Sequence, residues 1–589
     1  MSLPVYQPQA QAYQSGIAVL APYLDNRTLD VLARVNKQFF TIFGGYLWSD
    51  PIRILSRSSR PFTKTIQFLT RDHDVLFRAL VQALDFRPLV TLRNSNSYLR
   101  DLKRCEQFFN CQFFFGFLTS FKNLKFVAMD GVHIWNHHDY DITDDFPRFN
   151  TKILLLSASG SLKLDASTFL NKDTFTNLMF LDISWTDHAS DTISTLNNYQ
   201  FNNLRVLKMR NMRLTKLPRF ILIVGLGLWS LDLRSNFLTD DDIDALLLHC
   251  FKDPILRPGP LPLPVSDANF FEYPPEYSEH DDTQDDIPAR RPDNATLFME
   301  AMMNAGKTVS NPIYSLTGLT QLYIADNKFT ARGTGALLGS TNRLQVLDVG
   351  AVLSNIEIRI QGATHSTIFH AHEPILMPPS QLERIRVHHS FVTLVPTITL
   401  GSQMKYHIPY IKAAEQFAAG YPTDTNTSYD PLQNHRITHL ILTDIPTKSY
   451  GILIDHLVAL LRKVTRQIQD IEQVRTSSLT TRSHRAATLL PGLRLLRLEF
   501  LNDDGRSEPS TSVSGEKDAE TFLERSMGDF SFFGGELGRG KKEKKGNGKG
   551  KGQENEGEER VLRDVVAEIK AFREKELPRW PGQLQLVLP

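Results

Sequence analysis

One short pattern of aliphatic residues returns along the chain: leucine, two residues, an aliphatic residue, one residue and another aliphatic residue. It stands out in LRVLKM (204–209), LWSLDLRSNFL (228–238) and LTQLYIADNKF (319–329). Asn236 and Asn327 occupy the same offset in the two longer copies. The aliphatic side chains suit the interior of a stacked coil, and the asparagine can bond turn backbone that would otherwise be buried without partners. The pattern therefore predicts a repeating unit.

Weaker copies extend the pattern in both directions. Their aliphatic positions are Leu124/Val127/Met129, Ile153/Leu156/Ala158, Leu178/Leu181/Ile183, Leu344/Leu347/Val349, Leu382/Ile385/Val387, Ile437/Leu440/Leu442 and Leu493/Leu496/Leu498. The first positions 124, 153, 178, 204 and 228 are 24 to 29 residues apart. Pattern and spacing resemble the leucine-rich repeat, whose unit is roughly 20 to 29 residues long. The resemblance implies an α/β solenoid, with a curved parallel sheet and outer helices. Ordinary buried strands of an α/β domain are the alternative.

Larger steps between copies indicate insertions, and the two ends of the chain differ from the repeats. The first insertion is rich in proline and acidic residues, so we expect an exposed loop; the tract GRGKKEKKGNGKGKGQENEGEE cannot form a core. An apolar-periodic stretch at 450–474 predicts a long helix, and 559–576 with 583–588 predicts a capping helix and strand. The expected divisions are 1–60, F-box-like helices; 61–123, helical connector and cap; 124–250, repeats; 251–317, insertion; 318–501, enlarged repeats; 502–559, disordered insertion; and 560–589, C-terminal cap.

Composition and motifs argue against several functional classes. The formal net charge of +1 argues against nucleic acid as a partner, and three cysteines cannot build a disulfide framework. The chain lacks a long uncharged apolar stretch and a signal-peptide pattern, so we expect no membrane association and a cytoplasmic or nuclear protein that is not secreted. The AGKT sequence at 305–308 lacks the first glycine of a phosphate loop, and HIWNHHD at 133–139 reads as a solvated loop. We expect no enzyme activity, cofactor, metal or small-molecule substrate.

A forty-residue segment near the amino terminus has a different pattern. Residues 16–55 predict an apolar helix, a turn at Asp25 and a second helix, followed by Val-Asn-Lys-Gln-Phe (35–39) and Leu47-Trp48. This segment resembles the F-box. The resemblance implies docking on the Skp-type adaptor of a cullin-based ubiquitin ligase, with an unknown protein substrate held by the repeats. The candidate adaptor-binding residues are Leu24, Leu29, Leu32, Val35, Phe39, Leu47 and Trp48. The alternative is a leucine-rich-repeat scaffold or signalling protein whose first helices only cap the array.

The residues between the inward leucines should face the concave side of the solenoid. Those chosen as candidates for substrate binding are Asp182, Trp185, Lys208, Arg210, Asp232, Arg234, Tyr323 and Arg386. Asp182, Lys208 and Asp232 should form a ladder of alternating charge. Arg210 and Arg234 should be like charges on adjacent strands, which favours an acidic or phosphorylated partner segment. Local pairing of both arginines with Asp182 or Asp232 is the alternative.

Overall fold

The structure is a computed structural model of the 589-residue chain. It describes residues 20–56, 64–65, 67–68, 75–90, 111–132, 153–160, 175, 177–186, 201–251, 293–304, 318–339, 344–353, 366–370, 382–400, 404–405, 408–420, 429–432, 434, 436–480, 492–501 and 561–588.

The dominant feature of the described chain is a 12-stranded sheet in which all neighbouring strands are parallel. The strands, in spatial order, are β1 (Ala83–Asp85), β2 (Phe126–Ala128), β3 (Leu155–Ser157), β4 (Phe180–Asp182), β5 (Val206–Lys208), β6 (Ser230–Asp232), β7 (Gln321–Tyr323), β8 (Val346–Gly350), β11 (Arg384–His388), β14 (His439–Ile445), β16 (Leu495–Phe500) and β18 (Gln583–Val587). Spatial order follows chain order. The predicted α/β class is confirmed, and the stacking of one strand on the next is compatible with a solenoid.

The aliphatic pattern explains the interior. Leu207, Leu231, Leu322 and Leu347 are partners in the strand register, and each is fully buried in one continuous apolar cluster. Their burial was predicted from the spacing and is confirmed. Because side chains alternate across a strand, the residues on either side of each leucine point to the opposite face of the sheet.

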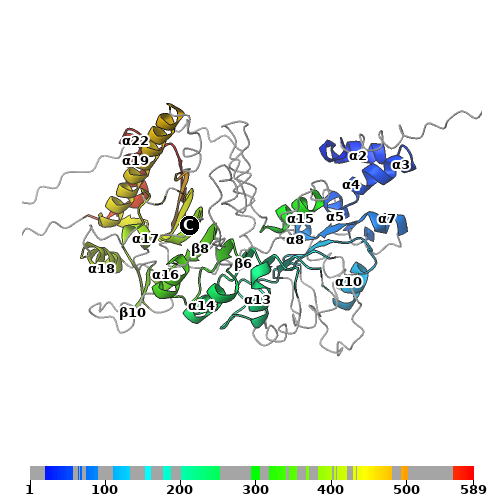
Figure 1. Ribbon diagram of the computed structural model, residues 1–589, viewed down its shortest axis with the longest axis horizontal. Helices are drawn as coiled ribbons and strands as arrows, with labels where there is room; N and C mark the ends of the chain where they lie inside the picture. Colours follow the sequence, from blue (N-terminus) through cyan, green and yellow to red (C-terminus); the bar gives the residue numbers. More distant parts are fainter. Residues whose placement is uncertain are drawn as a thin grey trace, which may run out of the picture.

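Helices line the interior side of this sheet. They include α10 (Cys111–Leu118), α13 (Arg219–Val224), α14 (Asp240–His249) and α16 (Ala331–Gly339). α14 begins as expected, because Thr239 and Asp242 form a capping box at its amino end. In Figure 1 these helices lie below the strands, while both ends of the curved chain rise above them. We call the face of the sheet opposite α13, α14 and α16 the concave face.

The carboxyl-terminal half contains larger units. The predicted long helix is α19 (Ile452–Thr480), and the tail forms α22 (Val565–Lys575) before β18 completes the sheet. Trp580 lies at that end, where its indole N–H donates to the carbonyl of Leu493. Two smaller sheets were not predicted. One is antiparallel, with β9 (Val352–Leu353), β10 (Ser366–His370), β12 (Thr397–Leu400) and β13 (Met404–Lys405); the other pairs β15 (Lys448–Ser449) with β17 (Arg563–Asp564). The helices α17 (Ser390–Thr393) and α18 (Ile408–Ala419) accompany them.

The amino-terminal segment is helical, and its last helix packs against the main core of the sheet through Ile52. It comprises η1 (Ala21–Tyr23), α2 (Asn26–Ala33), α3 (Lys37–Phe39), a π-helical turn η2 (Phe40–Gly44), α4 (Gly45–Leu47) and α5 (Pro51–Leu55). Asp25 caps α2 by accepting from the backbone N–H of Thr28. The range expected to be helical up to residue 123 contains α7 (Val75–Leu80), α8 (Arg87–Val90) and also the strand β1.

The insertion after β6 differs most from expectation. We expected residues 251–317 to be an exposed loop, yet the described part forms α15 (Ala295–Asn304), which lies above the strands in Figure 1, on the concave face. This expectation was therefore wrong for α15, because Phe298 is fully buried there against the side chains of Phe180 and Trp229. No helix within the described ranges is long and apolar enough to cross a membrane.

Candidate functional site

A ladder of polar side chains follows the concave face across successive strands. Asp182 is in register with Lys208, Lys208 with Asp232, and Asp232 with Tyr323. The predicted alternation of charge along these strands is confirmed. Tyr323 in turn faces Asp348, which continues the ladder into the second half of the sheet.

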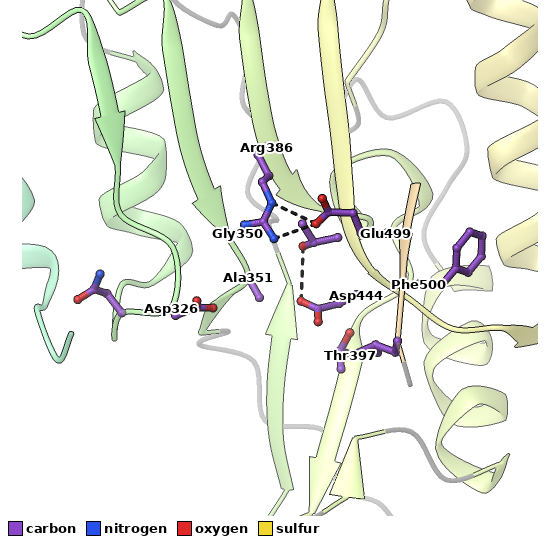
Figure 2. A pocket seen from close by; sticks show the side chains of 11 residues that line it. Asp326, Gly350, Ala351, Arg386, Thr397, Asp444, Glu499 and Phe500 are labelled. Atoms are coloured by element: carbon purple, nitrogen blue, oxygen red, sulfur yellow. Dashed lines mark hydrogen bonds and ion pairs between the residues drawn. The ribbon is translucent and has the colours of Figure 1, made fainter. Parts of the chain in front are cut away.

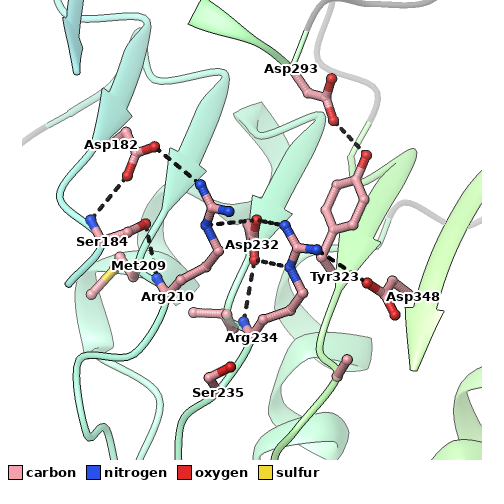
Figure 3. A network of polar contacts seen from close by, with 12 residues as sticks. Asp182, Ser184, Met209, Arg210, Asp232, Arg234, Ser235, Asp293, Tyr323 and Asp348 are labelled. Carbon is pink, nitrogen blue, oxygen red and sulfur yellow. Dashed lines mark hydrogen bonds and ion pairs between the residues drawn. The ribbon is translucent and has the colours of Figure 1, made fainter. Parts of the chain in front are cut away.

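The two arginines that follow β5 and β6 are paired within the molecule. Arg210 lies 3.7 Å from Asp182 and 3.4 Å from Asp232, while Arg234 lies 2.8 Å from Asp232 and 3.4 Å from Asp348. Figure 3 shows both guanidinium groups turned toward the carboxylate of Asp232. The anion that the two arginines share is therefore a residue of this chain, and the alternative of local pairing describes the site.

The ion pairs continue toward the carboxyl end of the sheet. Arg386 contacts Asp348 at 3.1 Å and Glu499 at 2.9 Å, and Arg497 contacts Glu499 at 2.9 Å. Acids and bases alternate from β4 to β16, and we call the whole set the ion-pair chain. Its members are Asp182, Arg210, Asp232, Arg234, Asp348, Arg386, Glu499 and Arg497.

The environment of Asp232 and Arg234 keeps both side chains charged. Burial alone would raise the pKa of Asp232, but Arg234 and Arg210 hold it below its ordinary value. Burial alone would lower the pKa of Arg234, but Asp232 and Asp348 raise it above its ordinary value. Burial, followed by the nearby Asp293 carboxylate, raises the pKa of Tyr323, whose hydroxyl donates to Asp293. Asp232 and Arg234 therefore stay charged despite their burial, and the Tyr323 hydroxyl stays protonated.

Burial divides the predicted substrate-binding residues into two groups. Asp182, Lys208 and Asp232 are buried, and the amine of Lys208 lies over the ring of Phe180. Arg210, Arg234, Tyr323 and Arg386 are partly exposed, so a partner would meet guanidinium edges and an aromatic ring. The Arg234 guanidinium lies 5.2 Å from the centre of the Tyr323 ring, a distance suited to a cation–π contact.

Trp185 is the exception, because it is exposed and has an unusual backbone. Its φ is 61°, in the left-handed region that bulky residues avoid. The residues three positions after the neighbouring strands share this conformation: Gly160 after β3, Asn211 after β5, Ser235 after β6 and Asp326 after β7. At Trp185 alone in this series the position carries a large aromatic side chain, and 44% of it is exposed.

A cavity of about 260 Å³ lies beyond the carboxyl ends of β8, β11, β14 and β16. Charged side chains from different strands line it, namely Asp326, Arg386, Asp444 and Glu499, and Phe500 forms part of its apolar wall. In Figure 2 the Arg386 guanidinium is bound to Glu499 at one side of this cavity. Arg386 was predicted from its strand position. Glu499 and Asp444 were not, although Glu499 follows Arg497 with the two-residue spacing that places both on one face.

The predicted adaptor-binding residues are placed differently from one another. Leu29 and Leu47 are buried in the core of the helical segment, and Leu24, Leu32 and Phe39 pack against that core. Trp48 is also partly buried, and its ring stacks on the ring of Phe68. Val35, by contrast, is 60% exposed. Buried leucines stabilise the segment itself, so the contact surface that the segment offers is made by other side chains.

The exposed apolar side chains of the segment lie on η1, α2 and the turn that follows α2. They are Leu20, Tyr23, Val31 and Val35, and Tyr46 on α4 is also exposed. Val31 lies in the last turn of α2, which ends at Ala33, and Val35 lies in the turn that follows. Sequence periodicity identified the apolar residues of this segment but did not separate those that face inward from those that face solvent.

Three titratable side chains outside the ion-pair chain, His388, His389 and Cys250, are buried. Within the described ranges no group of three or more histidine, cysteine or acidic side chains is arranged to hold a metal. His388 is fully buried and hydrogen-bonded to Ser390 and Thr397. Burial, and then the nearby His388, lowers the pKa of His389 well below its ordinary value. Burial raises the pKa of the Cys250 thiol to about 12, so it is inert as a nucleophile at neutral pH. The stretches 133–139 and 305–308 lie outside the described residues.

No family model matches the chain, and a search of curated proteins found no significant match.

Proposed function

We propose that this chain is an F-box-like, leucine-rich-repeat substrate receptor of a cullin-based ubiquitin ligase. The amino-terminal helices would bind a Skp-type adaptor, and the concave face would bind the protein to be ubiquitinated. Such a receptor performs no covalent chemistry. It holds a substrate lysine near the conjugating enzyme and so raises the effective concentration of the two.

One observation carries the proposal: a short helical segment with exposed apolar side chains packs against the first strand of a stack of parallel strands. The backbone N–H groups of Gln82 and Ala83, at the start of β1, both donate to the carbonyl of Ser49, which precedes α5. Ile52 of α5 is fully buried in the main core of the sheet. A receptor needs a fixed contact of this kind, since the geometry between adaptor and substrate decides whether a lysine is reached.

The same contact favours a second candidate, a scaffold or signalling protein. If α5 and Ile52 act only to cover the first strand, the segment is a cap of the kind that stacked repeats require. A pure cap gives no reason for exposed apolar side chains on its outer side. Val31 and Val35 are each 60% exposed and therefore support the receptor.

Co-purification with a Skp-type adaptor tests the choice. Val31→Asp combined with Val35→Asp should abolish co-purification, because charge would be placed in an apolar contact without altering the buried core of the segment. Leu248→Asp is the matched control, since Leu248 on α14 is 75% exposed and distant in sequence. Substituting Leu29 would be uninformative, because Leu29 is buried in the core of the segment.

The receptor role is contradicted if the folded wild-type chain fails to retain the adaptor. It is also contradicted if the double variant retains the adaptor as well as the Leu248 control does. Covering the end of the sheet would then be a sufficient explanation for the amino-terminal helices.

A further inference from the structure

An apolar stripe crosses the concave face of the first five strands. Ala83, Phe126, Leu155, Phe180 and Val206 occupy one register position on β1 to β5, and all are buried. They lie on the face opposite the inward leucines, and with Met179 and Trp229 they form a cluster separate from the main core. Without a covering element such a stripe would be an exposed apolar patch, which on a protein surface marks a binding site.

In this structure α15 fills the groove. Phe298 is the anchor: the centre of its ring lies 5.4 Å from that of Phe180 and 6.2 Å from that of Trp229. Ala295, three residues earlier on the same side of α15, is also buried. Met299 and Met302 pack against the edge of the same cluster. The arrangement is that of an amphipathic helix laid in a groove.

The attachment of α15 is slight. Leu297 and Met303 are exposed, and among the nine residues of α15 whose burial the structure describes, only Ala295 and Phe298 are buried. An isolated helix of this length is marginal in water, so its helical form depends on the groove.

Two polar contacts connect the region of α15 to the sheet. The Arg87 guanidinium donates to the hydroxyl of Thr296 at 2.9 Å, and the Tyr323 hydroxyl donates to Asp293. The main core does not include Phe298, because α15 lies on the other face of the sheet. The stacked strands therefore keep their interior when α15 leaves.

We propose that the stripe is a binding groove for an amphipathic helix with one aromatic anchor, and that α15 is an internal occupant which a helix of the substrate protein displaces. That the displacing helix belongs to a substrate rests on the proposed function; the groove itself does not. Because α15 belongs to the same chain, its effective concentration at the groove is in the millimolar range. A helix of another protein must therefore bind the groove more tightly than α15 does, through a better anchor or more contacts. The specificity is for a buried aromatic residue with a small residue three positions before it.

The test uses a fluorescent synthetic peptide with the sequence of residues 291–306 and measures its anisotropy with the full chain. The wild-type chain should bind this probe weakly, because its own α15 competes. Phe298→Ala in the full chain should release α15 and raise the affinity at least tenfold. Leu297→Ala, on the exposed side of the same helix, is the matched control and should behave like wild type. A probe with alanine in place of Phe298 should not bind either chain.

A second variant keeps the apolar contacts of α15 and so tests the proposal without the risk that loss of Phe298 unfolds the chain. Tyr323→Phe combined with Thr296→Val removes both polar contacts and leaves the anchor and the apolar wall in place, so the affinity for the probe should rise several-fold. Equal affinity of wild type and the Phe298 variant overturns the proposal. So does loss of a cooperative thermal transition in the Phe298 variant, because α15 would then be part of the fold. Probe binding by a chain that fails to retain the Skp-type adaptor would leave the groove standing and overturn only the ligase role.

Discussion

Asn327 repeats the hydrogen bonds of Asn236 one coil later. The amide of Asn236 donates to the carbonyls of Met209 and Leu233, and the amide of Asn327 donates to those of Leu233 and Ile324. Leu233 thus accepts from both asparagines. Each side-chain oxygen also accepts from backbone N–H groups of the preceding coil. The two residues connect three successive turns.

Replacing either asparagine should destabilise the chain. Asn236→Ala leaves several buried backbone groups without partners, each of which costs roughly 1 to 3 kcal/mol. Asn327 is less buried and accepts from one backbone N–H, that of Leu238, whereas Asn236 accepts from two. We therefore expect Asn236→Ala to lower the unfolding free energy more than Asn327→Ala in a urea titration. The reverse order would contradict the role given to these bonds.

The aliphatic spacing allowed ten of the twelve strands of the large sheet to be anticipated, and the alternation at 583–588 allowed an eleventh, β18. The inward leucines impose one register on every coil, so the position of Leu231 predicts those of Leu207 and Leu322. β1 could not be found this way, because Ala83-Leu84-Asp85 carries one leucine and stands outside the regular steps. Its strand conformation depends on pairing with β2.

Long-range packing accounts for what the sequence could not predict at the candidate site. The place of Phe298 on the concave face depends on contacts with Phe180 and Trp229, which are distant in sequence. The pairing of Arg210 and Arg234 was left open for a similar reason. Strand register predicts which side chains are neighbours, whereas the direction of a guanidinium depends on which carboxylates are within reach.

Removing the charge of Asp232 should destabilise the chain, because this buried carboxylate pairs with both Arg210 and Arg234. Asp232→Asn keeps the shape but removes the shared charge, and we expect a loss of roughly 3 to 5 kcal/mol of unfolding free energy. Asp30→Asn is the control, since its pair with Arg34 is on the surface and should contribute little. Chemical denaturation measures both.

The pH dependence of the Asp232 contribution has a defined sign. Arg234 and Arg210 hold its pKa below the ordinary value despite burial, so the contribution is complete above pH 3.8 and is lost as the pH falls through the lower folded-state value. The difference in stability between wild type and Asp232→Asn should shrink in acid. A difference that stays constant down to strongly acidic pH would contradict the pairing.

Asp50 should make stability depend on pH in the opposite sense. Burial, and then the neighbouring Asp85, raises the pKa of Asp50 from 3.8 to about 7. The protonated form is favoured by folding, so its contribution is fully present below pH 3.8 and is lost as the pH rises through about 7. The total is on the order of 4 kcal/mol. Asp50→Asn keeps an amino-terminal cap for α5 and mimics the protonated acid.

The measurement for Asp50 is the difference in unfolding free energy between the variant and wild type at several pH values. We expect Asp50→Asn to stabilise the chain relative to wild type at about pH 8, the advantage to be smaller at about pH 5, and the advantage to disappear below pH 3.8. Comparing the two chains cancels the effect of the other titrating groups. An advantage that is the same at both pH values would contradict the raised pKa.

Trp185 offers a test of whether backbone strain is retained on the concave face. Its φ of 61° costs a residue with a Cβ about 1 to 2 kcal/mol, and glycine avoids this cost. Trp185→Gly should therefore be more stable than Trp185→Ala by about 1 kcal/mol, since both lose the ring and only alanine keeps the strain. If the exposed ring binds a partner, both variants should lose that binding equally, although one of them is stabilised. Equal stability of the two variants in thermal unfolding would show that the left-handed backbone at this position stores no strain.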